Sequence, residues 1–184
     1  MKLINKHRIL ISFSIILLII FFLKKSFIST TEYKGKQIHE GGFYLGKILL
    51  TPNENFEKTQ IKEFKELKKF ISTNKLFVNG SSFIIYTSRS KTNTQYIIAV
   101  PVKQCSDILL PSKFVCNYYP KLDVLSVVHK GYLSKRYKGW EILDQYLKLK
   151  KKILINAPFE VFWKGIEQTK DSTKWITGLY YPIK

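Results

Sequence analysis

Cysteine, histidine and methionine are scarce in this 184-residue chain, which contains two, three and one of them. Cys105 and Cys116 have ten residues between them and no neighbouring histidine, so the ligand spacing of a zinc site is missing. The sequence therefore predicts no metal centre. In an oxidising compartment the two cysteines can form a disulfide, and elsewhere they would stay two thiols; both alternatives remain open.

The chain also lacks the short motifs of common enzyme chemistry. It has no glycine-rich phosphate loop, no His-Glu-x-x-His pattern and no Gly-x-Ser-x-Gly pattern. His39 and His129 stand at matching places, each at the end of the first predicted strand of one half of the chain. No acidic or cysteine partner stands at a useful spacing, which favours a structural role for both histidines. We expect no cofactor and no catalytic residue.

Acidic residues are few, because 13 Asp and Glu stand against 31 Lys and Arg, a formal net charge of +18. This surplus favours anionic partners, either lipid headgroups or nucleic acid. Nucleic acid is the weaker alternative, since no helix-turn-helix, RNA-recognition or zinc-finger pattern is present. A basic cluster flanks the second predicted helix and is either a solvated face or a contact with anionic lipid. It comprises Lys135, Arg136, Lys138, Lys148, Lys150, Lys151 and Lys152.

One long stretch, ILISFSIILLIIFFL at residues 9–23, contains no charge and has basic residues on both sides. As a helix it would span about 22 Å, and the flanking Lys and Arg can bridge the gap to the roughly 30 Å hydrocarbon core. No Ala-x-Ala site follows, so an uncleaved anchor is favoured over a signal peptide. We expect a basic segment over 1–8, a transmembrane anchor over 9–23 and a linker over 24–32. The charge balance favours a single-pass protein with its domain on the non-cytoplasmic side.

Residues 33–103 are predicted to form a strand, a helix and two strands. The first strand covers 33–39 and leads into a glycine-bearing turn at 40–46. FIIYTS and YIIAVPV are β-branched and aromatic runs of strand length. Between them and the turn, apolar residues recur at the spacing of an amphipathic helix; these are Phe56, Ile61, Phe64, Leu67 and Ile71.

Residues 121–184 repeat that order of elements. LDVLSVVHKG predicts a strand, KGWEILDQYLKLKK a helix, and FEVFW with WITGLYYPI a pair of strands. The copies also end alike, in AVPVK and YYPIK, which indicates a duplicated unit. The predicted fold class is α+β. Duplicated βαββ units would form one antiparallel sheet with two helices on one face and a cleft between the halves.

These segments resemble the GyrI-like small-molecule-binding domain, also called the AraC-type transcription effector-binding domain, over about residues 33–184. The resemblance is carried by GSSFIIY, IIAVPV, VVHKGYLSKRYKGWEILDQYL, APFEVFW and STKWITGLYYPI. It implies a cleft for amphipathic or cationic small molecules, here in a membrane-anchored stand-alone member. Some members inhibit DNA gyrase, and a few are similar to hydrolases. The resemblance carries Glu160 over as the acid of the cleft, whereas Gly178 stands where relatives often have a second acid, which argues against catalysis.

Strand alternation predicts that Glu160 and Phe162 lie on one side of their strand. If that side faces the cleft, Glu160 is a carboxylate beside aromatic rings and suits a cationic ligand; otherwise it is exposed or paired with a lysine. The predicted ligand-binding residues are Glu160, Phe162, Tyr86, Trp140, Trp175 and Tyr180, with Tyr181 as a further aromatic. Each of these rings has core packing as its alternative.

The sequence thus predicts a membrane-tethered, non-enzymatic domain that binds a small molecule. Two alternatives remain. One is a hydrolase that acts on a small electrophilic compound through Glu160, and the other is a protein-interaction module at the membrane. Neither the ligand nor the oligomeric state follows from the sequence.

Overall fold

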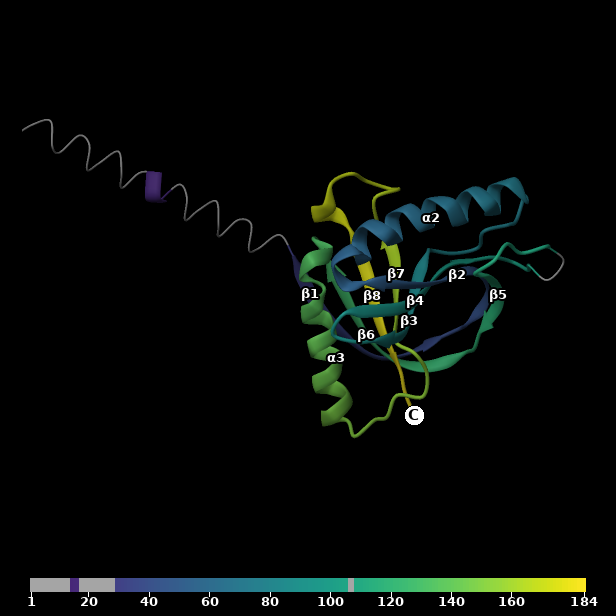
Figure 1. Cartoon of the computed structure of the whole chain (residues 1–184). Helices are drawn as coiled ribbons and strands as arrows, with labels where there is room; N and C mark the ends of the chain where they lie inside the picture. The colour runs from purple at the N-terminus through teal and green to yellow at the C-terminus, as the bar shows by residue number, and fades with distance from the viewer. Residues whose placement is uncertain (1–13, 17–28, 106–107) are drawn as a thin grey trace, which may run out of the picture.

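A computed structural model of the chain describes residues 14–16, 29–105 and 108–184 (Figure 1). Within these ranges no helix is long and apolar enough to cross a membrane. The anchor predicted over 9–23 lies outside the described residues, apart from 14–16, which are helical. The strands are β1 (Thr30–His39), β2 (Gly42–Pro52), β3 (Phe83–Arg89), β4 (Asn93–Pro101), β5 (Phe114–Tyr119), β6 (Leu122–Lys130), β7 (Phe159–Lys164) and β8 (Ile176–Pro182). The helices are η1 (Asn53–Asn55), α2 (Phe56–Thr73), η2 (Leu133–Lys135), α3 (Tyr137–Leu149) and η3 (Ser172–Lys174).

The strands form one antiparallel sheet in the order β1-β6-β8-β7-β3-β4-β2-β5. This order is symmetric about the β3–β7 pair, which joins the two halves of the chain. The similar sequence endings occupy similar places, since Val102 forms a bridge with Val78 and Ile183 forms one with Leu154. The two outer strands are exchanged, because β1 pairs with β6 of the second half and β5 pairs with β2 of the first.

Both long helices cover the same face of the sheet. Glu160 is the register partner of Ile84 on one side and of Leu179 on the other. Directly opposed residues of antiparallel strands share a face. Ile84 packs in the cluster under α2, and Leu179 packs in the cluster under α3. The predicted antiparallel sheet with two helices on one face is therefore present, and Glu160 lies between the two clusters.

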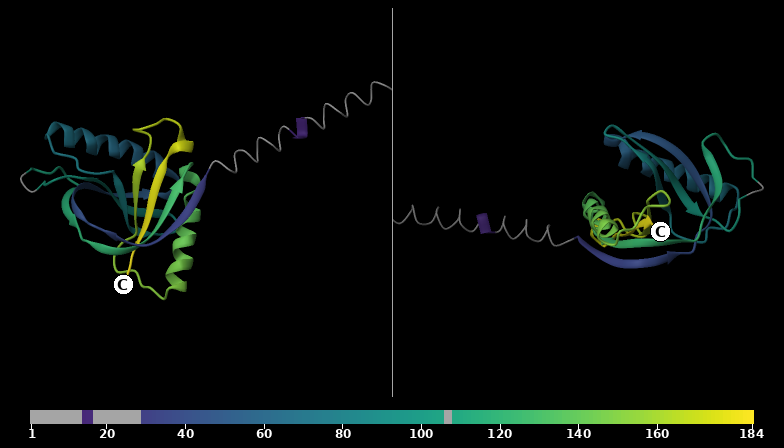
Figure 2. Two further views of the ribbon diagram at one scale, coloured as in Figure 1. Left: turned by 180° about the vertical axis from the view of Figure 1, so that it is seen from behind. Right: turned by 90° about the horizontal axis from the view of Figure 1, so that it is seen from below.

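The sheet curves strongly, as the views from behind and from below show (Figure 2). Only residues 40–41 connect β1 to β2, although these strands are far apart in the sheet order, and only residues 120–121 connect β5 to β6. The two connections touch, because a Cβ on Gly41 would lie 2.3 Å from the Tyr119 carbonyl oxygen. Gly41 also has a φ of +72°, so a side chain there would be strained as well as blocked. A side chain at this position would therefore force the two connections apart.

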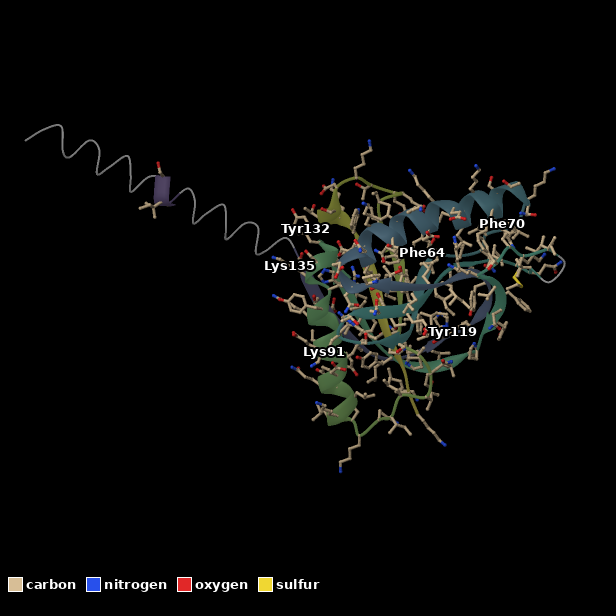
Figure 3. All side chains as sticks on the ribbon, viewed as in Figure 1. Phe64, Phe70, Lys91, Tyr119, Tyr132 and Lys135 are labelled. Atoms are coloured by element: carbon tan, nitrogen blue, oxygen red, sulfur yellow. A yellow bond between two sulfur atoms is a disulfide. The ribbon has the colours of Figure 1, made fainter. Side chains whose placement is uncertain are left out.

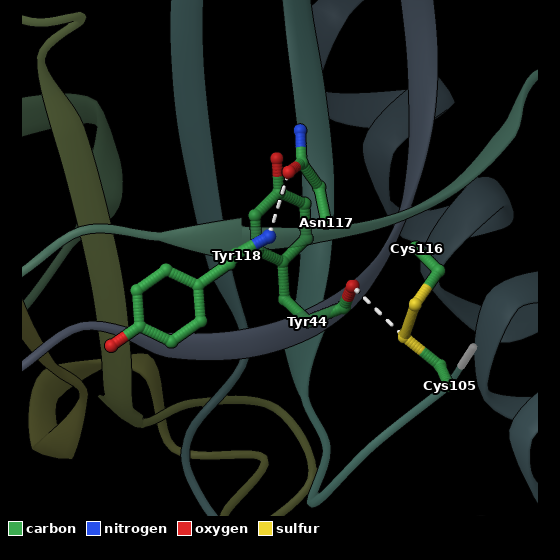
Figure 4. Close-up of a disulfide and its surroundings, with 5 residues drawn as sticks. All are labelled: Tyr44, Cys105, Cys116, Asn117 and Tyr118. Atoms are coloured by element: carbon green, nitrogen blue, oxygen red, sulfur yellow. Dashed lines mark hydrogen bonds between the residues drawn. A yellow bond between two sulfur atoms is a disulfide. The ribbon is translucent and has the colours of Figure 1, made fainter.

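The face opposite the helices has its own aromatic cluster, which includes Tyr44, Phe83, Tyr119, Phe159 and Tyr180. The helix face is built differently, since α2 directs Phe64 and Phe70 toward the sheet, where they meet Phe162 and Phe114 (Figure 3). Apolar residues thus fill both sides of the sheet. A disulfide between Cys105 and Cys116 ties the segment after β4 to edge strand β5, close to the Tyr44 carbonyl (Figure 4).

The sequence patterns missed one strand in each half. The sequence predicts a turn over the start of β2, and it predicts no strand at β5, which lies between the predicted repeats. Each half is therefore ββαββ rather than the predicted βαββ. The predicted equivalence of His39 and His129 is also wrong. By sheet register His39 corresponds to Tyr119, which stands at the end of β5, and His129 corresponds to Leu49 in β2. Both histidines are held by neighbouring groups. His39 lies between the rings of Tyr119 and Phe159, and the ring nitrogens of His129 contact the Thr31 hydroxyl and the Tyr132 carbonyl.

Candidate functional site

A pocket of about 550 Å³ opens between the N-terminal ends of α2 and α3. Its walls come from both halves of the chain, because η1 and α2 supply one side and η2 and α3 supply the other. Strands β3, β4 and β8 contribute to the lining between them. The lining residues are Asn53, Phe56, Glu57, Tyr86, Ser88, Arg89, Thr94, Leu133, Ser134, Arg136, Tyr137, Trp140, Asp144, Pro158 and Tyr181.

Aromatic rings form a continuous wall of this pocket. Trp140 meets Tyr86 edge-on at a centroid distance of 5.8 Å and stacks on Tyr181 at 5.6 Å. Phe56 continues the wall from α2, with its ring 6.1 Å from that of Tyr86. Tyr181 is fixed by a 2.7 Å hydrogen bond that its hydroxyl donates to Asp144 Oδ1. These contacts hold the rings in fixed positions before any ligand arrives.

Glu160 lies directly beneath this wall and is fully buried, with 0% exposure. The Tyr86 hydroxyl donates a 2.7 Å hydrogen bond to Glu160 Oε1. Burial, together with the nearby Glu160 carboxylate, raises the pKa of Tyr86 well above its usual value, so Tyr86 stays a donor at any physiological pH. Glu160 is not among the lining residues, which means that Tyr86 separates one of its oxygens from the pocket.

Arg136 holds the other carboxylate oxygen. Its Nε lies 3.2 Å from Glu160 Oε2, and only 12% of its side chain is exposed. This is an ion pair without hydrogen-bond geometry, since Oε2 has no hydrogen-bond partner among the residues that the structure describes. Burial is the strongest influence on the Arg136 pKa and lowers it, but Glu160, Tyr86 and Glu57 together outweigh burial and raise the pKa above its usual value. The two buried charges therefore compensate each other.

The guanidinium of Arg136 has further contacts on its pocket side. Nη1 donates to the Leu133 carbonyl at 3.5 Å and lies 4.0 Å from the Glu57 carboxylate. The group also lies 6.0 Å from the centre of the Phe56 ring. Arg136 is thus fixed between α2, the start of α3 and the sheet, and it lines the pocket while it pairs with Glu160.

Solved structures share this fold. The EcmrR C-terminal domain superimposes with a TM-score of 0.71 at 16% identity, over 85% of this chain and 98% of that domain. EcmrR in its complex with DNA superimposes with a TM-score of 0.72 at 17% identity, over 100% of this chain and 72% of EcmrR. SAV2435 bound to tetraphenylphosphonium superimposes with a TM-score of 0.58 at 17% identity, over 83% of this chain and 94% of SAV2435. A hydrolase from Listeria innocua superimposes with a TM-score of 0.53 at 7% identity, over 82% of this chain and 92% of the hydrolase.

The domain has the GyrI-like fold. At these identities the likeness concerns the fold alone. No protein-family model and no curated protein sequence matches the chain.

The GyrI-like fold brings some of the predicted site residues together and separates others. Tyr86 and Trp140 line the pocket, as does Tyr181, and Glu160 lies beneath it. Phe162 shares the face of Glu160 but packs against Phe64 of α2.

Two of the predicted aromatics lie away from the pocket. Tyr180 projects from the opposite face, where it stacks on Phe159. Trp175 precedes β8 and donates from Nε1 to the Thr169 carbonyl at 2.9 Å. These two rings make structural contacts within the domain and do not line its pocket.

Gly178 also belongs to the face opposite the helices. It is the register partner of Val161, and the Tyr180 ring occupies the space where a side chain would stand. Glu160 is on the helix face. An acid at position 178 would therefore point away from Glu160, so the glycine removes no neighbour of that carboxylate.

Sequence reasoning missed Arg136 as the partner of Glu160. Arg136 belongs to a basic cluster that is usually solvated, and no periodic pattern relates the N-cap of α3 to the middle of β7. Its position between Tyr132 and Trp140, at the start of an apolar helix face, was the one available signal that its side chain is buried.

Proposed function

We propose that the chain is a membrane-tethered, non-enzymatic binding protein whose GyrI-like domain takes up an amphipathic small molecule, neutral or cationic. The ligand would occupy the pocket between α2 and α3. The observation that carries this proposal is the aromatic wall of Phe56, Tyr86, Trp140 and Tyr181 around a pocket of about 550 Å³. Ligand sites typically have volumes of roughly 300 to 1,000 Å³ and are lined mainly by apolar and aromatic groups.

The fold supports the same proposal. SAV2435, which shares the GyrI-like fold, was solved with tetraphenylphosphonium, a large aromatic cation. Aromatic side chains bind a ligand with several aromatic rings by burying its apolar surface and by stacking, and neither interaction requires a particular functional group. The pocket of this chain offers the same kind of surface, because five aromatic residues line it: Phe56, Tyr86, Tyr137, Trp140 and Tyr181.

The disulfide supports a location outside the cytoplasm. Disulfides persist in oxidising compartments and are rare in the cytosol. Cys105 is buried and bonded to Cys116. Together with the apolar run at residues 9–23, this bond supports a protein anchored by its N-terminal segment, with the GyrI-like domain on the non-cytoplasmic side.

The chemistry of the pocket favours binding over turnover. A general base must reach the proton that it abstracts. Glu160 is fully buried and is held by Tyr86 and Arg136, so its carboxylate does not face the pocket directly. The open pocket likewise favours a small-molecule ligand over a purely protein-interaction role.

Isothermal titration of the full-length chain with two probes tests the proposal. The probes are tetraphenylphosphonium and its uncharged analogue triphenylphosphine oxide. We expect at least one of them to bind, and Trp140→Ala to weaken that binding by at least about tenfold, because Trp140 contacts both Tyr86 and Tyr181.

Trp163→Ala is the matched control, since Trp163 is 43% exposed and neighbours Tyr180 on the opposite face. Its binding constants should stay within about twofold of the wild type. No binding of either probe, or wild-type affinity in Trp140→Ala, would overturn the proposal.

A further inference from the structure

We propose that Arg136 determines the charge of the ligand that this pocket accepts. It acts as a built-in counter-ion for Glu160, so the pocket prefers an uncharged amphipathic molecule to a cation. The inference rests on the proposed function and narrows its ligand class.

The charged groups at the pocket differ in their exposure to water. Glu57, Arg89 and Asp144 also line the pocket, but all three are exposed and water screens their charges. Arg136 lines the pocket and Glu160 lies beneath it, and both charged groups are removed from water. The exposed fraction of the side chain is 12% for Arg136 and 0% for Glu160. The interior of the site is therefore electrically balanced before a ligand enters.

A ligand in the pocket meets Arg136 before it meets Glu160. The pocket is lined by Arg136 and Tyr86, whereas Glu160 stands behind them. A cation in the pocket would approach the guanidinium before it approached the carboxylate. Like charges that come together away from water repel strongly, so this encounter disfavours a cation.

The guanidinium of Arg136 favours an uncharged hydrogen-bond acceptor instead. Arginine carries five N–H donors in a planar fork. An uncharged ligand with a hydrogen-bond acceptor, such as a carbonyl or a phosphine oxide, would add a partner to this group without adding charge. The aromatic wall next to Arg136, formed by Trp140 and Phe56, accommodates the apolar body of the same molecule.

The test compares the two probes on variants of the full-length chain. Arg136→Gln removes the built-in counter-ion and leaves Glu160 uncompensated beneath the pocket. We expect it to bind tetraphenylphosphonium at least about tenfold more tightly than the wild type, while triphenylphosphine oxide binds no more tightly than before. Lys138→Gln is the control, because it removes an exposed charge from the same helix outside the pocket. Its affinities should stay within about twofold.

Two further variants keep the test decisive if Arg136→Gln does not fold. Glu160→Gln leaves Arg136 uncompensated and should weaken tetraphenylphosphonium binding at least about tenfold, with a smaller effect on the neutral probe. The double variant Arg136→Gln with Glu160→Gln carries neither charge, and its ratio of the two affinities should lie between those of the single variants.

The outcomes also separate this inference from the proposed function. If the neutral probe binds and depends on Trp140, but removal of the Arg136 charge leaves the affinity for tetraphenylphosphonium unchanged or lower, the role of Arg136 is wrong and the binding function stands. If neither probe binds any variant, the binding function fails, and the charge preference fails with it.

Discussion

Single side chains in this domain acquire their properties from burial. His129 is 1% exposed, and its ring nitrogens lie 2.9 Å from the Thr31 hydroxyl and 2.9 Å from the Tyr132 carbonyl. In the neutral form Nε2–H donates to the carbonyl, and Nδ1 accepts from the hydroxyl. Burial lowers the pKa of His129 below the usual 6.5, although the Tyr132 carbonyl opposes this shift, and the charge of Arg136 lowers the pKa further.

The lowered pKa predicts a loss of stability in mild acid. The unfolded chain takes up the proton near pH 6.5, before the folded chain does. The contribution of His129 is therefore complete above pH 6.5 and is lost as the pH falls from 6.5 toward the folded pKa. Urea denaturation between pH 7.5 and 5.5 should show a falling free energy of unfolding, and His129→Gln should reduce that fall.

His39 contributes in the same direction, since burial lowers its pKa too, so some of the fall should remain in His129→Gln. A ¹H–¹³C NMR titration of the full-length chain measures the two ring pKa values separately. A value for His129 at or above 6.5 would contradict the argument.

At the scale of elements, the position of α3 depends on one small residue. A Cβ on Gly139 would lie 2.4 Å from Leu179 Cδ1 and 3.1 Å from Val127 Cγ1. Both side chains are fully buried and cannot swing into solvent. Glycine thus lets α3 approach β6 and β8 closely, and the next residue, Trp140, reaches the pocket wall from there.

We predict that Gly139→Ala destabilises the domain. Alanine in a helix gains about 0.5 to 1 kcal/mol over glycine, but overpacking a filled core costs about 1 to 3 kcal/mol. The net loss should be about 1 kcal/mol in urea denaturation, the difference between the middle values of these two ranges. Gly165→Ala is the control and should change stability by less than about 0.5 kcal/mol, because a Cβ there would contact only the Gln168 side chain at 4.0 Å. Equal effects of both substitutions would contradict the close approach of α3.

The long amphipathic helices and the strong β-branched runs could be predicted from sequence, because their periodicity is local. α2 buries Leu67 and Ile71 as its pattern predicts, although Ile61 stays 51% exposed. β2 and β5 were missed for different reasons. β2 begins in a glycine pair typical of turns, and β5 is a short edge strand that its pairing with β2 stabilises.

The candidate site could likewise be predicted from sequence only where local patterns specify it. Tyr86 and Trp140 were predicted from their aromatic character within recognisable elements. The ion pair between Arg136 and Glu160 depends on the approach of α3 to β7, which no local pattern specifies. Tyr180 and Tyr181 lie on opposite faces of the sheet, because adjacent residues of a strand point to opposite faces. The β7–β8 register determines which of the two tyrosines lies on the pocket side.

At the scale of the whole molecule, each half depends on the other for its edges. Within the described part of the chain β5 pairs with β2 alone, and its chain connection to β6 is only two residues long. The disulfide holds the segment before β5 against the cluster under α2, where Cys105 packs with Phe114. The bond therefore stabilises the edge at which the two halves exchange strands.

We predict that loss of this disulfide destabilises the domain and loosens β5 first. Closing a loop of this size contributes about 2 to 3 kcal/mol through the restricted unfolded chain. Urea denaturation should show that loss both after treatment with dithiothreitol and in the variant Cys105→Ala with Cys116→Ala. Dithiothreitol should have no effect on that variant, which controls for other actions of the reductant. Hydrogen exchange should rise in residues 114–119 more than in β6 to β8. Two free thiols in the purified oxidised protein, or unchanged exchange in β5 after reduction, would contradict this account of the sheet edge.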